Sequence, residues 1–361
     1  MSTGPLAGIR VVEMAGIGPG PFCAMLLADM GADVVRIGRV GQGSGFPAPY
    51  DLLDRGKRTL ALDLKAAADV TTARALIERA DVVIEGFRPG VMEKLRLGPD
   101  SFPANPRLVY GRMTGWGQDG PLAQAAGHDI NYIAITGVLD AIGPAGGAPI
   151  IPLNLLGDFG GGSLYLAMGV LAAVIAARHT GAGQVVDAAI VDGATSLLTL
   201  HYALTQMGRW PGGRGENLLD GGAPFYSVYE TADGRYVSVG AIEPQFYAEM
   251  VARMGLDPAV LPEQHDNARW PELRDRLAAA FRDRTRDEWC AVLEGTDACF
   301  APVLCLQEAR APPHNVHRAN VLTGEGVARP APAPRFAGSG SGGARPDAED
   351  IEAILARWTT A

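Results

Sequence analysis

Short apolar runs alternate with helical stretches along the first third of the chain, and this alternation restricts the fold more than any other feature. The runs are short and rich in β-branched residues, as expected of buried strands. They cover residues 9–14, 32–37, 59–64, 81–87 and 107–113. The stretches between them, such as 21–31 and 71–80, have helical spacing. Strands that alternate with helices predict an α/β fold with a mostly parallel sheet covered on both faces.

The pattern changes after residue 200. Residues 201–224 are rich in glycine and predict a linker. Residues 225–242 predict a β-hairpin, because two strand-like runs flank an Asp-Gly pair. Further helices are expected near 244–254, 271–281, 286–294 and 348–358. The predicted organisation is a large α/β domain at 1–200, the linker at 201–224, a small α+β domain at 225–310, and a return segment at 311–361 that completes the large domain.

The longest apolar stretch, residues 164–177, is too short to span a bilayer and predicts a buried helix. The N-terminus has no basic segment followed by an apolar one, so it does not resemble a secretory signal. The cysteines show neither C-x-x-C nor zinc-site spacing; they are Cys23, Cys290, Cys299 and Cys305. Unpaired thiols are typical of a reducing compartment. We therefore expect a cytoplasmic protein without a membrane partner and without a bound metal.

The net charge of −9 argues against non-specific binding of nucleic acid. The first hundred residues hold equal numbers of basic and acidic side chains, so the remainder carries the whole excess of acid. Random fluctuation would also produce such a difference. If a polyanionic ligand binds, however, the first hundred residues are the favoured region.

The loop after the first predicted strand contains Gly16, Gly18 and Gly20, but Pro21 breaks the dinucleotide-binding pattern. The second strand ends with arginines at 36 and 39, where a nicotinamide enzyme usually has an acid for the ribose. Arginine at that place suits a phosphate. More basic residues follow, namely Arg55, Lys57, Arg58, Lys65, Arg88 and Lys94. Each alone is typical of a solvated surface, but together they predict a site for a nucleotide with several phosphates.

His128 is the histidine whose surroundings favour catalysis. Gly127 precedes it and a polar run entering a helix follows it. A helix N-terminus favours neutral imidazole, which is the form that a general base requires. A lone histidine is nevertheless more often structural than catalytic.

Asp158 is the second residue of a glycine-rich segment, GDFGGGS (157–163), directly before the longest apolar stretch. Three consecutive glycines allow close approach to the backbone, and free N–H groups at a helix start can hold an oxyanion. The alternative is an ordinary helix cap by Asp158. Glu243 follows a predicted strand and precedes a proline, which by itself indicates only an acid at a helix start.

These motifs together resemble one known family. The segments VVEMAGIGPGP, IEGFRPGVMEKLRLGP, AGHDINYIAITGVL, LNLLGDFGGGS, GAGQVVDAAIVDG and ADGRYVSVGAIEPQFYAEM, in this order, are similar to those of the α-methylacyl-CoA racemases in the family III CoA-transferase superfamily. The likeness covers almost the whole chain and is greatest to the mycobacterial members. Residues 40–58 match least well. The resemblance implies a Rossmann-like large domain, a smaller α+β domain and two chains interlocked in a homodimer.

The resemblance also implies roles for individual residues. His128 and Asp158 would exchange protons with the two faces of the α-carbon, and Glu243 would be a supporting carboxylate in a site shared between subunits. The backbone N–H of Asp158 and a helix beginning at its glycines would hold the thioester oxygen. No cofactor is needed beyond the coenzyme A that the substrate carries. The coenzyme A site would be lined by Arg39, Leu62, Asp63, Leu64, Lys65, Gly86, Phe87, Arg88, Lys94, Gly127, Asp129, Ile130, Asn131 and Tyr132.

Two other functions fit parts of the same pattern. A CoA transferase on this fold would use Asp158 as a nucleophile and form an acyl-enzyme, but it has no evident use for His128. A non-catalytic protein that binds acyl-CoA would need neither side chain. The pair of acid/base residues therefore favours the racemisation of 2-methylacyl-CoA thioesters.

Overall fold

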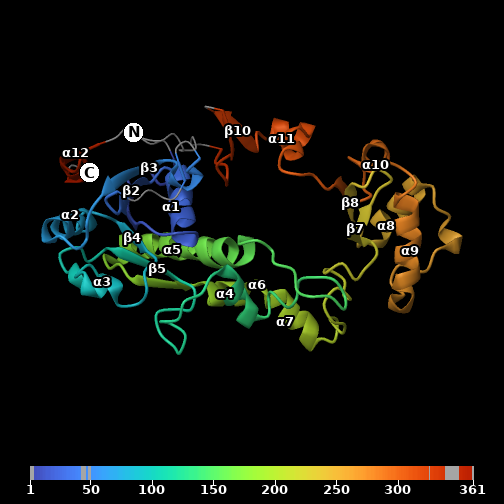
Figure 1. Ribbon diagram of the computed structural model, residues 1–361, viewed down its shortest axis with the longest axis horizontal. Coiled ribbons are helices and arrows are strands. Elements are labelled where there is room, and N and C mark those ends of the chain that lie inside the picture. The colour runs from blue at the N-terminus through green and yellow to red at the C-terminus, as the bar shows by residue number, and fades with distance from the viewer. Residues whose placement is uncertain (1–3, 42–45, 48–49, 325, 338–348, 360–361) are drawn as a thin grey trace. The chain divides into compact units, whose positions relative to one another are not determined.

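Two compact units make up the chain in the computed structural model, which describes residues 4–41, 46–47, 50–324, 326–337 and 349–359 (Figure 1). The first unit comprises Met1–Val138, Pro152–Leu198 and Val321–Ala361. The second unit comprises Leu139–Ile151 and Thr199–Asn320. The chain therefore leaves the first unit twice and returns to it each time.

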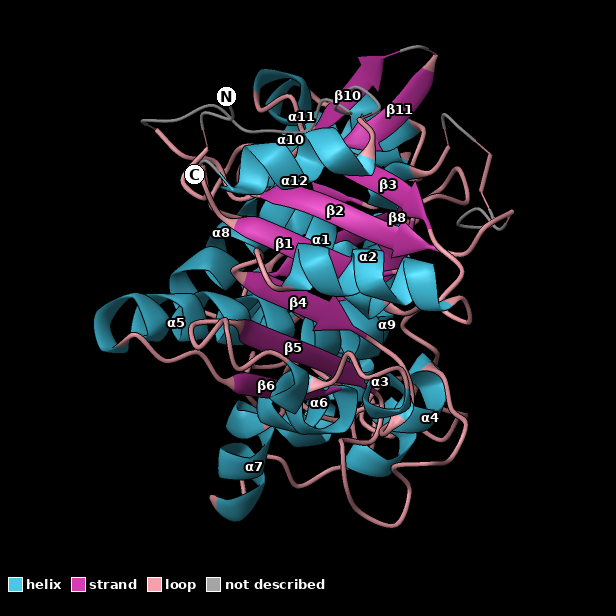
Figure 2. Ribbon diagram, turned by 90° about the vertical axis from the view of Figure 1, so that its left-hand side faces the viewer, coloured by secondary structure: helices cyan, strands magenta, loops and turns pink. Residues whose placement is uncertain are grey.

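A six-stranded sheet forms the centre of the first unit, in the order β3-β2-β1-β4-β5-β6 (Figure 2). All five pairings between these strands are parallel. The strands are β1 (Arg10–Met14), β2 (Asp33–Gly38), β3 (Lys57–Ala61), β4 (Val82–Glu85), β5 (Val109–Thr114) and β6 (Val185–Ala189). The predicted parallel sheet is confirmed. Its order reverses between β1 and β4, and ligands of such sheets bind beyond the carboxyl ends of the strands at this point.

Helices cover both faces of this sheet because neighbouring strand residues point in opposite directions. Val11 faces a core made with α1 (Pro19–Asp29) and α5 (Leu164–Thr180). Val12 faces a second core, which includes residues of α2 (Ala67–Ile77) and α12 (Ile351–Thr359). The remaining elements of this unit are α3 (Val91–Lys94), α4 (Asp129–Thr136), α6 (Ile190–Leu197) and the antiparallel pair β10 (Val321–Gly324) and β11 (Val327–Pro330).

The second unit contains the predicted hairpin, β7 (Tyr226–Glu230) and β8 (Tyr236–Gly240), which pair antiparallel. Gly234 in the turn has φ 70°, a conformation that glycine adopts at little cost. The short strand β9 (Phe300–Pro302) pairs with β8. The predicted helices are also confirmed, as α8 (Pro244–Met254), α9 (Trp270–Phe281) and α10 (Arg286–Leu293), and they accompany α7 (Thr199–Gln206) and α11 (Pro313–His317).

The boundaries of the two units differ from the sequence-based ones at residues 139–151 and 311–320. We expected both segments in the large domain, but they belong to the second unit. The first of them has an identifiable contact. Arg214 supplies the reason, because its Nη1 donates to the carbonyl oxygen and Oδ1 of Asp140 at 2.7 and 2.8 Å. Its Nη2 donates to the Gly147 carbonyl at 2.5 Å. The glycine-rich segment predicted as a linker thus has specific contacts of its own.

Among the described residues, one helical stretch, Leu155–Thr180, is long and apolar enough to cross a membrane by length and composition. It is longer than the predicted stretch 164–177 because a π-helix, Leu155–Ser163, leads into α5 without a break. Leu166 and Val170 of α5 pack in the core against the sheet. The core helix of an α/β unit has this same length and composition.

Candidate active site

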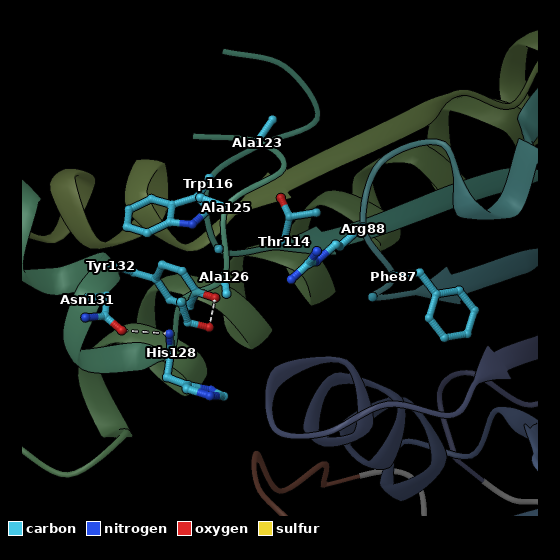
Figure 3. Close-up of a pocket in the computed structure, with 13 residues that line it drawn as sticks. Phe87, Arg88, Thr114, Trp116, Ala123, Ala125, Ala126, His128, Asn131 and Tyr132 are labelled. Carbon is cyan, nitrogen blue, oxygen red and sulfur yellow. Dashed lines mark hydrogen bonds between the residues drawn. The ribbon is translucent and has the colours of Figure 1, made fainter. Parts of the chain in front are cut away.

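His128 lies at the N-terminal end of α4, where hydrogen bonds hold both its backbone N–H and its backbone carbonyl. The His128 N–H donates to Asn131 Oδ1 at 3.1 Å, and the His128 carbonyl accepts from the Asn131 N–H at 2.8 Å. Figure 3 shows the first of these bonds and the imidazole extending away from Asn131. These two bonds use backbone atoms of His128, so its exposed imidazole can still contact a ligand.

A cavity of about 550 Å³ opens beside His128. Trp116 and Tyr132 meet edge to face in its wall, with ring centroids 4.7 Å apart, and the Tyr132 hydroxyl donates to the Gly127 carbonyl (Figure 3). A Cβ at Gly115 would overlap the Tyr132 ring, so glycine is required there. The cavity is lined by Gly86, Phe87, Arg88, Thr114, Gly115, Trp116, Ala123, Ala125, Ala126, Gly127, His128, Asn131 and Tyr132. Six residues of this wall come from the segment 114–126 and were not predicted from the sequence.

The turn at residues 86–88 is held by Glu85, a buried carboxylate at the end of β4. Glu85 Oε2 accepts from the Phe87 N–H at 2.8 Å, and Glu85 Oε1 accepts from Arg112 Nε at 2.9 Å. Burial raises the pKa of Glu85, and the bonds from Phe87 and Arg112 oppose the rise. Glu85 and Arg112 were not predicted from the sequence, although an acid that ends a strand before a glycine was a usable signal.

Asp158 lies in the first turn of the π-helix, whose N-cap is Asn154. The alternative of a helix cap by Asp158 is therefore wrong, and the helix begins at Leu155, before the glycines, rather than at them. The glycines instead allow α6 to pack closely against the π-helix. A Cβ at Gly161 would lie 2.6 Å from the Ala194 nitrogen, and a Cβ at Gly193 would overlap the Gly161 carbonyl. π-Helical segments occur frequently at functional sites.

The backbone N–H of Asp158 already has an acceptor. It donates to Asp129 Oδ1 at 2.6 Å. We expected this N–H to bind the thioester oxygen of a substrate, but in the structure the Asp129 carboxylate is its acceptor.

The structure brings His128 and Asp158 into one cluster. The pKa of the Asp158 carboxyl is raised, mainly by burial and also by the negative charge of Asp129. A hydrogen bond from Asn154 Nδ2 at 3.4 Å and the charge of His128 oppose the rise. Gly18 approaches the same carboxylate closely, since a Cβ there would lie 3.0 Å from Asp158 Oδ2. A carboxyl group with a raised pKa is better matched to proton transfer near neutral pH.

The other residues predicted to bind coenzyme A fall into two groups. Leu64, Lys65 and Lys94 line a second cavity, of about 430 Å³, together with residues of α2. Five of the predicted residues lie outside both cavities, namely Arg39, Leu62, Asp63, Asp129 and Ile130. Asp63 shapes the turn before α2, because its Oδ1 accepts from the Lys65 N–H at 3.1 Å. Asp129 contacts Asp158 instead.

Four of the basic residues that we expected to meet phosphates are instead paired with acids. The pairs are Arg36 with Asp54 at 3.4 Å, Arg55 with Asp29 at 2.5 Å, Lys57 with Glu13 at 2.7 Å and Arg58 with Asp33 at 2.8 Å. The first three cations are buried, so they cannot reach a ligand. The prediction was wrong for these residues, whereas Arg39, Lys65, Arg88 and Lys94 are exposed.

Glu243 belongs to the second unit and immediately precedes α8. Its side chain is exposed. Its proximity to His128 and Asp158 stays a prediction.

Known proteins resemble the chain in sequence and in fold. Residues 6–345 match the model of CoA-transferase family III. The chain is 50% identical over 332 residues to the α-methylacyl-CoA racemase of Mus musculus and 48% identical over 333 residues to that of Homo sapiens, in each case covering 91% of this chain and 86% of the relative. A CAIB/BAIF family protein from Brucella suis superposes with a TM-score of 0.84 at 25% identity, covering 99% of this chain and 100% of that one. The fold implied by the resemblance is thereby confirmed.

Proposed function

The chain belongs to CoA-transferase family III, and we propose that within this family it is an isomerase that inverts the α-carbon of 2-methylacyl-CoA thioesters. The identity of about half of its residues to two racemases supports this activity. The observation that carries the proposal is a contact: the Asp158 N–H donates at 2.6 Å to Oδ1 of Asp129, the residue directly after His128. Inversion at carbon requires two acid/base groups, one for each face.

The proposed reaction moves one proton off the α-carbon and another onto it. His128 takes the proton from one epimer, and the electrons of the broken C–H bond pass to the thioester oxygen as an enolate. Protonated Asp158 then gives its proton to the opposite face, which restores the thioester with inverted configuration. The other epimer reacts in the reverse sense, with Asp158 as the base. The raised pKa of Asp158 suits both duties.

The enolate requires stabilisation, since a thioester α-proton is a very weak acid. The Asp158 N–H donates to Asp129, so another group must stabilise the negative charge of the enolate. The N-terminal end of α4, with its positive dipole, lies at His128. We infer that a thioester oxygen beside His128 is stabilised by this end of α4.

The coenzyme A part of the substrate would extend over the two cavities at the carboxyl edge of the sheet. Trp116 and Phe87 give the cavity beside His128 an apolar wall for the thioester arm. Lys65 and Lys94 in the second cavity are exposed cations that suit the phosphates.

Removing both lysines tests this placement. We expect Lys65→Ala/Lys94→Ala to raise KM for an acyl-CoA roughly tenfold with little change in kcat, because these contacts act equally in the ground and transition states. Steady-state kinetics at low and high salt measure the effect, and salt should reproduce part of it in the unaltered protein. Arg178→Ala, at the exposed end of α5, is the control. An unchanged KM would exclude both lysines from the site.

We propose that the protein forms the homodimer with interlocked subunits that the family resemblance implies. An apolar stripe on the outer side of α5 supports this: Leu164, Met168 and Ile175 are each more than half exposed, at spacings that place them on one face of the helix. Glu243 of a partner chain would then complete the site. Sedimentation velocity should give twice the mass of 37.8 kDa, and a monomer that is fully active would contradict the shared site.

A cytoplasmic location remains a proposal. The cysteines of the chain are unpaired in the structure, which suits a reducing compartment.

The activity is tested in deuterated water with a single epimer of a 2-methylacyl-CoA. We expect deuterium to enter the α-position while the optical purity of the substrate falls. A CoA transferase would move coenzyme A to an added free acid without this exchange, and a binding protein would do neither. Either of these results would replace the proposed function.

A further inference from the structure

One buried carboxylate connects the two proposed acid/base groups. Asp129 directly follows His128 and is only 8% exposed. Its Oδ1 accepts from the Asp158 N–H at 2.6 Å, and the Gly157 N–H donates to the same carboxylate. The other oxygen, Oδ2, is buried without a hydrogen-bond partner among the described residues. The side chain therefore spans from the start of α4 to the turn that carries Asp158.

The π-helix leaves a space that fits this carboxylate. A Cβ at Gly157 would overlap Asp129 Oδ1 and would lie 3.0 Å from a methyl carbon of Ile133. Glycine at 157 is therefore required for the carboxylate to reach the two N–H groups. Because the contact depends on two residues from distant parts of the chain, it is a built feature of the site rather than a surface coincidence.

We propose that Asp129 is a positioning residue that holds His128 and Asp158 at the separation needed for proton transfer on opposite faces of one carbon. This inference rests on the proposed function. A displacement of about 1 Å at a reacting group can cost about 10²-fold in rate. Asp129 follows His128 in the chain and accepts a hydrogen bond from the backbone of Asp158. It therefore restricts the movement of one acid/base residue relative to the other.

Asp129 also acts on Asp158 through its charge. The groups that face the Asp158 carboxyl are Asp129, His128 and Tyr132 from α4 and Asn154 at the start of the π-helix. The negative charge of Asp129 raises the pKa of Asp158. Removing that charge should therefore shift the pH dependence assigned to Asp158 toward lower pH.

Two variants separate the geometric role from the electrostatic one. Asp129→Asn keeps an oxygen that can accept the two N–H bonds but removes the charge. Asp129→Ala removes both. We expect Asp129→Ala to lower kcat for α-proton exchange about 10- to 100-fold, as for other groups that orient a reacting residue, with KM changed less than about threefold. Asp129→Asn should recover most of kcat and move the acidic limb of the kcat/KM profile to lower pH.

The experiment is α-deuterium exchange from each 2-methylacyl-CoA epimer across a pH series, with far-ultraviolet circular dichroism to confirm folding. Asp119→Asn, an exposed acid outside both cavities, is the matched control and should leave the profile unchanged. If the unaltered protein exchanges no deuterium, the proposed function fails, whatever Asp129 does. If it does exchange and folded Asp129→Ala keeps its kcat, the positioning role is overturned. Should Asp129→Ala not fold, Gly157→Ala decides, because its Cβ displaces the Asp129 carboxylate but leaves its charge: an unchanged kcat in this variant overturns the inference.

Discussion

Replacing His128 with alanine should lower the rate of racemisation by about 10²–10⁴-fold, the contribution typical of a positioned general base. The fold should survive the change, because the contacts at the start of α4 run through the His128 backbone and Asn131. The imidazole itself is exposed beside the cavity. A loss of activity without a loss of stability would therefore report on chemistry alone.

The two epimers should respond differently to this variant. If His128 serves one face of the α-carbon and Asp158 the other, Asp158 can still remove a proton from its own epimer and return it to the same face. The variant should then retain deuterium exchange from one epimer, without inversion, and lose it from the other. His179→Ala, at the exposed end of α5, is the control for histidine removal. Racemisation by His128→Ala at the unaltered rate would remove His128 from the mechanism.

The fold could be predicted from the sequence to the extent that local patterns determine it. Paired apolar residues such as Val11 and Val12 indicate a strand buried on both faces, and the structure places them in separate cores. The Asp-Gly pair similarly determines the turn between β7 and β8. The membership of residues 139–151 in the second unit could not be predicted, because it depends on Arg214, which lies far along the chain.

The residue types of the candidate site could be predicted from the sequence, but the contacts between these residues could not. His128 and Asp158 lie in recognisable motifs, and the structure joins Asp158 to Asp129, the residue after His128. Whether a basic residue can bind phosphate depends on its burial. Arg36 and Lys57 look like phosphate ligands in sequence, but they form ion pairs with acids in the core. The acceptor of the Asp158 N–H likewise comes from a different segment, so no local pattern reveals it.

Replacing Lys57 with methionine should cost about 3–5 kcal/mol of stability in the first unit, since it leaves a buried carboxylate without its partner. Lys57 is 1% exposed and Glu13 is fully buried, with Nζ and Oε2 2.7 Å apart. The ammonium also donates to the Pro21 carbonyl at 3.0 Å, in the first turn of α1. Hydrogen exchange of the β1 amides measures the loss within this unit. Lys65→Met, the same change at an exposed position, should have an effect within about 0.5 kcal/mol.

The pH dependence of the Lys57→Met variant distinguishes an unpaired charge from a simple packing defect. Burial raises the pKa of Glu13 and Lys57 opposes the rise, so removing Lys57 raises that pKa further. A carboxyl group whose folded pKa lies above its unfolded value loses stability as the pH rises through the folded pKa. The variant should therefore be less stable at about pH 8 than at about pH 5. Glu13→Leu/Lys57→Met should remove this difference and restore much of the lost stability, because an apolar pair leaves no charge in the core. A loss that is equal at both pH values and persists in the double variant would mean that packing and the Pro21 contact, rather than charge pairing, are what Lys57 contributes.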